Sequence, residues 1–460
     1  MPTKKQLKET KRVSIIEGSF YWIMAGFGTL FITPFALRFG ATTADVGFLQ
    51  TFPYLIGSVL QVFYQKLASL FSNRRRLIQS LVSIQALSWL ALIILPLLWR
   101  NEAVALIIFI YSIGIIAETF ANPAWTSWMA DVVREKERNA YFGKRNEITC
   151  FVAFIATLTA GFALNFFQGA YGWVIAFAVV FTIAFAGRMA CFFLFNRMTE
   201  PAEKRFKAEG GFRDFLKTMR STAFGRLTLY MTFLSFAVYV SSPYFAVYML
   251  RDLRFDYLTF GVIAAAMQIT LFLTPTYWGW LGKKFGDKTT LYASGLLVVL
   301  VPLGWVLCTN PALIFVIEMA SGMGWAGQRL ASFNLILKTA PEKSRARFVA
   351  YYNLFVGIAL FAGAMAGALL ASYFENAFLL FATGLPAVFL VSFFLRLAAV
   401  ALCVPKIQVE SKPVESKAEL LKLVTVYPLR SAMHEIHSGM LVGLKGARLV
   451  KTKILKRVKK

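Results

Sequence analysis

Histidine is almost absent from this 460-residue chain, which has only His434 and His437. Both lie near the C-terminal end, so the rest of the chain has neither a histidine proton relay nor a histidine-based zinc site. The four cysteines have no metal-ligand spacing and predict no disulfide framework: Cys150, Cys191, Cys308 and Cys403. A phosphate loop of the form G-x-x-x-x-G-K-S/T is also missing, which argues against ATP as an energy source. We therefore expect no enzyme, no metal and no cofactor.

Acidic residues are scarce as well, with 23 Asp and Glu against 49 Lys and Arg, a formal net charge of +26. Such a charge can indicate nucleic-acid binding, but no nucleic-acid motif accompanies it. The cations lie in the short gaps between apolar segments and in the last part of the chain. Anionic lipid headgroups are the expected partner there, and we expect no nucleic acid.

Apolar residues are abundant, at 58% of the chain with a mean hydropathy of +0.61, beyond what a soluble domain of this length can bury. Polar breaks separate about twelve apolar stretches of roughly 20 residues, each long enough to cross a bilayer core of about 30 Å. The predicted spans are 14–38, 46–67, 77–99, 103–126, 147–168, 172–195, 227–249, 257–281, 289–308, 312–337, 348–372 and 377–402.

Positive charge is concentrated in every second gap. One side has Arg74, Arg75 and Arg76 in a single gap, whereas the gaps of the other side have only isolated arginines such as Arg38 and Arg251. Because positive charge resists translocation, the basic side is predicted to be cytoplasmic, with both termini inside. We expect a multi-pass protein of the cytoplasmic (inner) membrane.

The two halves of the chain resemble each other. Aligning Asn146 with Asn353, an offset of 207 residues, also places Arg138 on Arg345. Six-span halves repeated in parallel are an architecture of transporters, with the substrate site between the halves. The predicted domains are an N-terminal six-helix bundle (1–195), a cytoplasmic central loop (196–226), a C-terminal six-helix bundle (227–404) and a basic cytoplasmic tail (405–460). In the central loop, 212–219 is predicted to form an amphipathic helix on the membrane surface.

Two stretches, Gln65-Lys66-Leu67-Ala68-Ser69-Leu70-Phe71-Ser72-Asn73-Arg74-Arg75 and Gly279-Trp280-Leu281-Gly282-Lys283-Lys284-Phe285-Gly286-Asp287-Lys288, are similar to the signature G-x-L-A-D-R-x-G-R-R. On these residues the chain resembles the major facilitator superfamily, in particular poorly characterised bacterial members, over about 10–404. The resemblance implies an all-α membrane protein with twelve transmembrane helices in two pseudo-symmetric bundles, and we expect a monomer.

In that family the signature Asp joins a cytoplasmic charge network that latches the gating bundles. Here Ser69 and Lys283 stand in its place. A gate would have to use other charges, and our candidates are Arg74, Arg75, Asp131, Arg138, Lys283, Lys284 and Arg345.

Ionisable residues inside the spans are costly and indicate function. The resemblance implies that spans one, four, seven and ten line the central cavity. A carboxylate removed from water can bind and release a proton near neutral pH. The candidates for proton coupling are Glu118, Glu318 and Glu17, with a structural carboxylate satisfied by hydroxyls or an arginine as the alternative for each.

Further polar and aromatic residues of the spans are candidates for the cavity wall. Arg329 can bind an anionic substrate through its forked donors, or else pair at the cytoplasmic gate. Hydrogen bonds and stacking are expected from Gln328, Trp325, Asn122, Trp125, Tyr239 and Gln268. Pro34, Pro123 and Pro243 are predicted to bend their spans. Arg188 and Arg396, on the peripheral spans six and twelve, are predicted to extend to the cytoplasmic headgroups. Gly357, Gly363 and Gly367 predict a seam of close helix contact.

Together these features predict a secondary active transporter that moves a small organic solute by alternating access, with a proton or another ion as the candidate driving ion. Two alternatives remain open, a lipid, lysolipid or drug exporter of the same fold and a non-transporting membrane sensor or scaffold.

Overall fold

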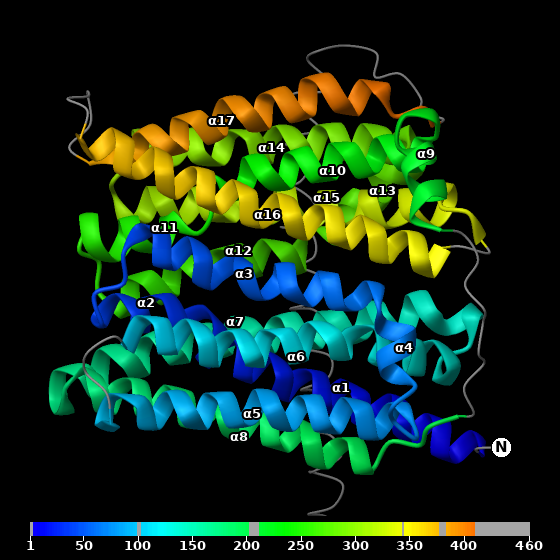
Figure 1. Ribbon diagram of the computed structural model, residues 1–460, viewed down its shortest axis with the longest axis horizontal. Helices are drawn as coiled ribbons and strands as arrows, with labels where there is room; N and C mark the ends of the chain where they lie inside the picture. The colour runs from blue at the N-terminus through cyan, green and yellow to red at the C-terminus, as the bar shows by residue number, and fades with distance from the viewer. Residues whose placement is uncertain (1–2, 99–102, 202–210, 343–344, 377–382, 410–460) are drawn as a thin grey trace, which may run out of the picture.

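A computed structural model describes residues 3–98, 103–201, 211–342, 345–376 and 383–409. These residues form helices and connections without a strand (Figure 1). The predicted basic tail lies almost entirely outside the described residues.

Each of the twelve predicted spans coincides with a helix or a broken helix. In chain order they are α1 (Lys4–Phe27) with η1 (Thr29–Phe31) and α2 (Ile32–Arg38), α3 (Thr43–Val62) with α4 (Tyr64–Ala68), α5 (Arg74–Leu98), α6 (Ala103–Val132), α7 (Arg138–Tyr171), α8 (Trp173–Asn196), α10 (Ala223–Tyr239) with α11 (Tyr244–Val247) and η3 (Tyr248–Asp252), α12 (Tyr257–Leu273) with α13 (Pro275–Phe285), α14 (Asp287–Leu307), α15 (Pro311–Thr339), α16 (Arg345–Asn376) and α17 (Gly384–Cys403).

Nine of the described spans are long and apolar enough to cross a membrane, and the pair α12 and α13, bent by 45°, makes a tenth. The two remaining spans, α3 and α15, are long helices packed within the same bundles. Glu318 and Arg329 lower the hydropathy of α15, since each is a charged group in an otherwise apolar helix.

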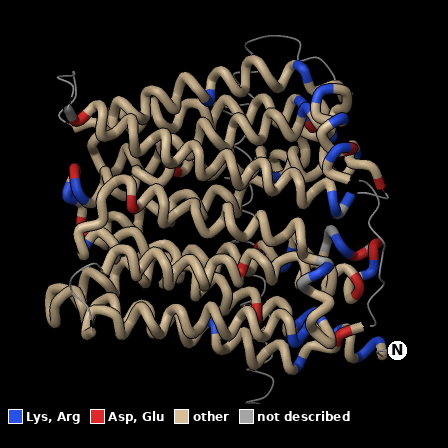
Figure 2. The backbone as a smooth tube through the Cα atoms, in the orientation of Figure 1, with Lys and Arg blue, Asp and Glu red and all other residues tan. Residues whose placement is uncertain are grey.

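The helices form two bundles, α1 to α8 in blue to green and α10 to α17 in green to orange (Figure 1). The bundles meet along two seams, α7 against α12 and α3 against α16. Charged residues gather at one end of the molecule, here called the basic end, and are few at the other, here called the sparse end (Figure 2).

Spans one, seven and eight are broken along their length. Span one changes from α1 to η1 at Gly28, span seven is interrupted between Tyr239 and Tyr244, and span eight bends before Pro275. Proline lacks the N–H that would continue the helical ladder, which accounts for breaks beside Pro243 and Pro275. Pro123, by contrast, lies within an uninterrupted α6.

The predicted repeat is visible in matched contacts. Arg138 donates to the carbonyl of Ala130 at 3.0 Å, and Arg345 donates to the carbonyl of Leu337 at 3.1 Å, with the same offset of 207 residues for donor and acceptor. Each guanidinium thereby satisfies a carbonyl at the C-terminal end of span four or span ten. These two gate candidates therefore close helix ends within their own bundles.

A second matched pair has its charges reversed. Arg74 at the start of α5 forms an ion pair with Asp131 at 2.7 Å, whereas Asp287 at the start of α14 pairs with Lys338, which is 207 residues after Asp131. Arg74 also binds Glu200, at 3.1 Å. Each of these ion pairs joins residues of the same bundle. In this conformation they therefore connect neighbouring helices and do not hold the two bundles together.

The amphipathic helix predicted in the central loop is present as α9 (Phe212–Ser221). Its apolar face is covered by protein. Its buried face, Phe215 and Met219, packs against Phe348 and Tyr351 of α16. A Cβ at Gly225 would lie 1.9 Å from the carbonyl oxygen of Thr218, so glycine is what lets α10 start this close to α9.

The predicted glycine seam of span eleven is confirmed. A Cβ at Gly363 would lie 2.4 Å from the carbonyl oxygen of Phe236, and one at Gly367 would lie 2.1 Å from that of Val240. Gly357 faces Ser58 of the other bundle, with 2.3 Å between its Cβ position and the hydroxyl. Only glycine allows α16 to approach both α10 and α3 at these distances.

Candidate functional site

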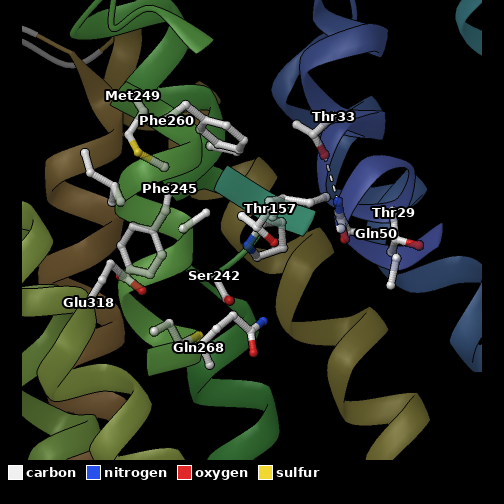
Figure 3. A pocket seen from close by; sticks show the side chains of 18 of the residues that line it. Thr29, Thr33, Gln50, Thr157, Ser242, Phe245, Met249, Phe260, Gln268 and Glu318 are labelled. Atoms are coloured by element: carbon white, nitrogen blue, oxygen red, sulfur yellow. Dashed lines mark hydrogen bonds between the residues drawn. The ribbon is translucent and has the colours of Figure 1, made fainter. Parts of the chain in front are cut away.

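A cavity of about 370 Å³ lies between the two bundles (Figure 3). Spans one, two and five form one wall, and spans seven to ten form the other. The residues that line it are Trp22, Ala25, Gly26, Thr29, Leu30, Thr33, Gln50, Ala153, Thr157, Tyr239, Ser242, Pro243, Phe245, Ala246, Met249, Phe260, Ile263, Ala264, Met267, Gln268, Trp305 and Glu318.

The N-terminal wall offers neutral hydrogen-bonding groups. Thr29 and Thr33 follow the break of span one at Gly28, and Gln50 of α3 donates to the hydroxyl of Thr33 at 2.7 Å. Thr157 adds a hydroxyl from α7. Because each of these groups is uncharged, this wall can orient a ligand without fixing the sign of its charge.

The C-terminal wall combines one carboxylate with aromatic rings. Glu318 of α15 accepts a hydrogen bond from the indole N–H of Trp305 at 3.0 Å. Phe245 stacks on Trp305 with ring centroids 4.7 Å apart, and Phe260 and Met249 continue the apolar surface. Figure 3 shows the Glu318 side chain beside Phe245, on the wall that faces Thr157 and Gln50. Among the lining residues that the structure describes, Glu318 alone has a formal charge.

The bundles are joined at the sparse end. Arg38 of α2 donates to the hydroxyl of Tyr257 at 2.6 Å, and Arg251 donates to that of Thr43 at 3.2 Å. Phe31 of span one packs edge-to-face on Phe260 of span eight. These contacts place a wall between the cavity and the sparse end.

Cross-bundle bonding is thinner toward the basic end. Asn353 of α16 donates to Gln61 of α3 at 3.1 Å. In the part of the chain that the structure describes, the residues equivalent by the 207 offset, Asn146 and Gln268, make no hydrogen bond to each other, and Gln268 lines the cavity. Among the described residues, every ion pair at the basic end joins helices of the same bundle.

Comparison with known proteins agrees with this architecture. The family model of the Major Facilitator Superfamily matches residues 13–248 and 227–457. The chain belongs to the Major Facilitator Superfamily. A sequence search of curated proteins gave no significant match.

Solved structures of transporters share the fold. A bacterial homolog of the human lysosomal transporter Spinster, in an inward-facing and unoccupied conformation, aligns with a TM-score of 0.59 at 16% identity, over 94% of this chain and 98% of that one. The nucleoside transporter NupG aligns at 0.62 and 10% identity, over 87% and 100%. A bacterial homologue of the iron transporter ferroportin, inward-facing, aligns at 0.63 and 13% identity, over 87% and 99%. At these identities the likeness shows the superfamily fold alone.

Glu118 lies inside the N-terminal bundle and not in the cavity wall. One carboxylate oxygen accepts a hydrogen bond from the hydroxyl of Tyr21 at 2.6 Å, and the other accepts one from the amide of Gln85 at 2.5 Å. The hydroxyls of Tyr54 and Tyr111 lie close enough to interact with its charge. Its hydrogen-bond partners in the described residues are thus neutral donors from spans one and three.

Glu17 is buried between spans one and five, where its carboxylate lies 3.6 Å from the guanidinium of Arg145. Arg145 also stacks over the ring of Trp125 at 4.4 Å. Glycine at position 18 leaves room for Arg145, since a Cβ there would lie 2.4 Å from its terminal nitrogen. Glu17 and Trp125 therefore belong to one cluster within the N-terminal bundle, away from the cavity.

The remaining candidates divide by position. Tyr239 and Gln268 line the cavity. Gln328 is fully buried in the C-terminal bundle, where it donates to the carbonyl of Leu291 at 2.6 Å and accepts from Tyr230 at 3.1 Å, and Trp325 packs beside the same core. Asn122 is exposed and accepts from Thr126 at 3.3 Å. These three residues are not part of the lining.

The charged candidates lie nearer the basic end. Arg329 is exposed, and its guanidinium interacts electrostatically with Cys150 of α7 and Tyr239 of α10, which places it between the bundles but outside the cavity lining. Lys283 and Lys284 are exposed at the end of α13, with the ammonium of Lys284 over the ring of Trp280 at 5.3 Å. The backbone N–H of Arg75 donates to Glu200 at 3.2 Å.

The prediction that Arg188 and Arg396 extend to headgroups is wrong. Arg396 is 2% exposed and donates to the carbonyls of Val298 and Val238 at 2.9 and 3.3 Å. It also donates to the hydroxyls of Ser241 and Ser392. Arg188 is 4% exposed and lies over the ring of Tyr21 at 5.4 Å. The carbonyl of Val298 in α14 has no helical donor, because Pro302 four residues later has no N–H, and this carbonyl attracts the guanidinium of Arg396 inward. An aromatic face attracts the guanidinium of Arg188.

Sequence reasoning missed several cavity residues, among them Gln50, Thr33, Phe245 and Trp305. Gln50 was detectable as an amide in an apolar span, but the aromatic residues were not, because this chain is rich in aromatic residues throughout. Within the described residues, no three His, Cys, Asp or Glu side chains come together in a way that would hold a metal ion.

Proposed function

We propose that this member of the superfamily moves a small organic solute by alternating access, with the cavity between the bundles as its binding site. The observation that carries the proposal is the position of the cavity. It lies between two pseudo-symmetric bundles, lined by both, with cross-bundle contacts concentrated at the sparse end. Rocking of the bundles about such a site exposes it to each side in turn.

The basic end is proposed to face the cytoplasm of a bacterial inner membrane, with both termini inside. The distribution of charge in Figure 2 supports this orientation, because positive loops are retained on the cytoplasmic side. The conformation described above is then inward-facing, closed on the outside by Arg38, Tyr257, Arg251 and Thr43. Exposed lysines and arginines at this end would contact anionic lipid headgroups, and the transporter would act as a monomer.

Proton coupling is proposed for Glu118 and Glu318. The hydrogen bonds of Glu118 come from the neutral donors Tyr21 and Gln85, and within the described residues no ion pair balances the charge that protonation removes. Glu318 lines the cavity and can exchange its proton for a bound ligand. Glu17 is the third candidate, but its pairing with Arg145 supports a structural role. Arg329, between the bundles, is the proposed contact for an anionic group or for the gate.

The test uses purified protein in proteoliposomes loaded with candidate solutes and energised by a pH gradient. Sugars, nucleosides, organic anions, organic cations and lysolipids form the panel, and lysolipid movement alone would favour the exporter alternative. Glu118→Gln should abolish accumulation driven by the pH gradient but retain exchange of labelled for unlabelled solute. Glu9→Gln, at an exposed carboxylate near the N-terminus, serves as the control.

No movement of any compound by folded protein would contradict transport. Equal accumulation by the wild type and by both the Glu118→Gln and Glu318→Gln variants would contradict proton coupling at these residues.

A further inference from the structure

Within the described residues, Glu318 is the single charged group on the cavity wall. One oxygen of the Glu318 carboxylate is fixed by the indole N–H of Trp305 at 3.0 Å, and the side chain makes no other hydrogen bond or ion pair within the described residues. The indole N–H is a neutral donor, so it orients the carboxylate without cancelling its charge. A ligand in the cavity therefore meets an oriented carboxylate whose second oxygen has no fixed partner.

The positive charge that balances Glu318 lies behind the wall. The guanidinium of Arg396 interacts electrostatically with Glu318 but is 2% exposed. Its donors are used by Val238 and Val298 and by two serine hydroxyls. Arg396 therefore cannot reach an anion in the cavity. The surface presented to a ligand remains negative.

Aromatic rings line the same cavity as the carboxylate. Phe245 is stacked on Trp305, and Tyr239, Phe260 and Trp22 line the same space. Ring faces attract cations, most strongly where water is excluded. The opposite wall supplies only neutral donors and acceptors, such as Gln50 and Thr157. A cation with an apolar body matches both walls, whereas an anion would meet Glu318 with no cation in the lining to offset it.

Arg329 does not change this conclusion. It lies eleven residues after Glu318 on α15, about 16 Å along the helix at 1.5 Å per residue, and it is not part of the lining. Its guanidinium lies between the bundles, where it interacts with Cys150 of α7 and Tyr239 of α10. An anion bound at Arg329 would therefore occupy a different place from a ligand held at Glu318.

We propose that the cavity recognises a monovalent organic cation with an apolar or aromatic body, its ammonium group against Glu318 and its body against Phe245 and Phe260. The inference deepens the proposed transport function by naming the class of solute. Binding itself can be measured without transport, which separates the two proposals.

The experiment compares three probes of one shape with different charge: a phenylbutyl-trimethylammonium ion, its neutral tert-butyl isostere and the matched phenylalkyl carboxylate. Dissociation constants are measured by equilibrium binding to monodisperse protein in detergent, with thermal stabilisation as a second readout. The ammonium probe should bind about tenfold or more tighter than the neutral isostere, the range expected for a carboxylate with aromatic faces. The carboxylate probe should bind most weakly.

The variants assign the preference to Glu318. Glu318→Gln keeps a hydrogen-bond acceptor for Trp305 but removes the negative charge. The dissociation constants of the ammonium and neutral probes should then differ by no more than about twofold, because only the aromatic rings still favour the cation. Glu318→Asp should retain the order of the three probes. Phe245→Leu keeps the charge and should weaken the ammonium probe more than the neutral one. Glu9→Gln should bind as the wild type does. If Glu318→Gln is not monodisperse, the Glu318→Asp and Phe245→Leu variants still test whether the cation preference comes from this site.

Two results would overturn the inference: tighter binding of the carboxylate probe, especially if Arg329→Gln abolishes it, or an ammonium preference that survives Glu318→Gln unchanged. Uptake of the bound ammonium probe into proteoliposomes is then measured separately. Binding with cation selectivity but without uptake would contradict transport and leave the site assignment intact. Uptake of solutes from other classes, with no ammonium preference, would contradict the inference and leave transport intact.

Discussion

The guanidinium of Arg396 donates to the carbonyl oxygen of Val238 at 3.3 Å, at the point where span seven is interrupted. The same group donates to the hydroxyl of Ser241 at 2.8 Å, inside the interruption. A peripheral helix, α17, thereby supports the break of a cavity helix. The break turns Phe245 and Met249 toward the cavity, so this buried arginine has a direct bearing on the shape of the site.

Arg396→Met should destabilise the protein. The change removes charge-assisted hydrogen bonds to two carbonyls and two hydroxyls in the interior, and we expect a loss of about 2–4 kcal/mol in unfolding free energy. Thermal unfolding in detergent measures the loss. Arg213→Met, at an exposed arginine of α9, should change stability by less than about 0.5 kcal/mol. Equal unfolding free energies for the two variants would show that the break of span seven does not depend on the hydrogen bonds of Arg396.

Arg145 and Glu17 should behave as a coupled pair. Arg145→Met leaves a buried carboxylate without its nearest cation, and we expect a destabilisation of about 3 kcal/mol. Combining it with Glu17→Gln should restore at least half of that loss, because the buried charge is then gone. A double-mutant cycle by thermal unfolding measures the coupling. Additive losses would mean that the 3.6 Å contact has no energetic role.

Gly367→Ala should be harmful despite the small size of the added group. The new Cβ would meet the backbone carbonyl of Val240 at 2.1 Å, and backbone at a helix seam has little freedom to move away. Overpacking of this kind costs about 1–3 kcal/mol. The matched control is Gly279→Ala in α13, where nothing lies within 4 Å and stability should rise slightly. Thermal unfolding that ranks the two variants in the opposite order would contradict the seam.

Tyr257→Phe should weaken closure at the sparse end. It removes the acceptor of Arg38, a charge-assisted hydrogen bond between the bundles, and should raise the free energy of the closed arrangement by about 1.5–3 kcal/mol. Spin labels at the sparse ends of α3 and η3 should report a larger population of long distances. Tyr373→Phe, at an exposed tyrosine of α16, is the control. An unchanged distance distribution would place the closure elsewhere, for example at Phe31 and Phe260.

Much of the architecture could be predicted from local sequence. A stretch of about 20 apolar residues can satisfy its backbone in lipid only as a helix, so hydropathy located all twelve spans to within a few residues in most cases. The ends extend further than hydropathy predicts, since α1 begins at Lys4 and α7 at Arg138, in polar sequence that hydropathy does not detect. The 207-residue repeat was readable because both copies retain the arginine that closes a helix end, Arg138 and Arg345.

The sequence by itself thus determined the helices, the two-bundle repeat and the distribution of charge between the two ends. The tertiary structure alone decided which polar side chains face the cavity. Glu118 and Glu318 look equivalent in sequence, as single carboxylates in cavity spans, yet one is enclosed by Tyr21 and Gln85 while the other lines the site. Arg396 is a second example. Its place on a peripheral span predicts contact with lipid headgroups, but it is buried and donates a hydrogen bond to Val238, beside the break of span seven. Hydropathy depends on residue type alone. The direction in which a side chain points depends instead on the rotation of its helix and on the hydrogen-bonding groups of the neighbouring helices.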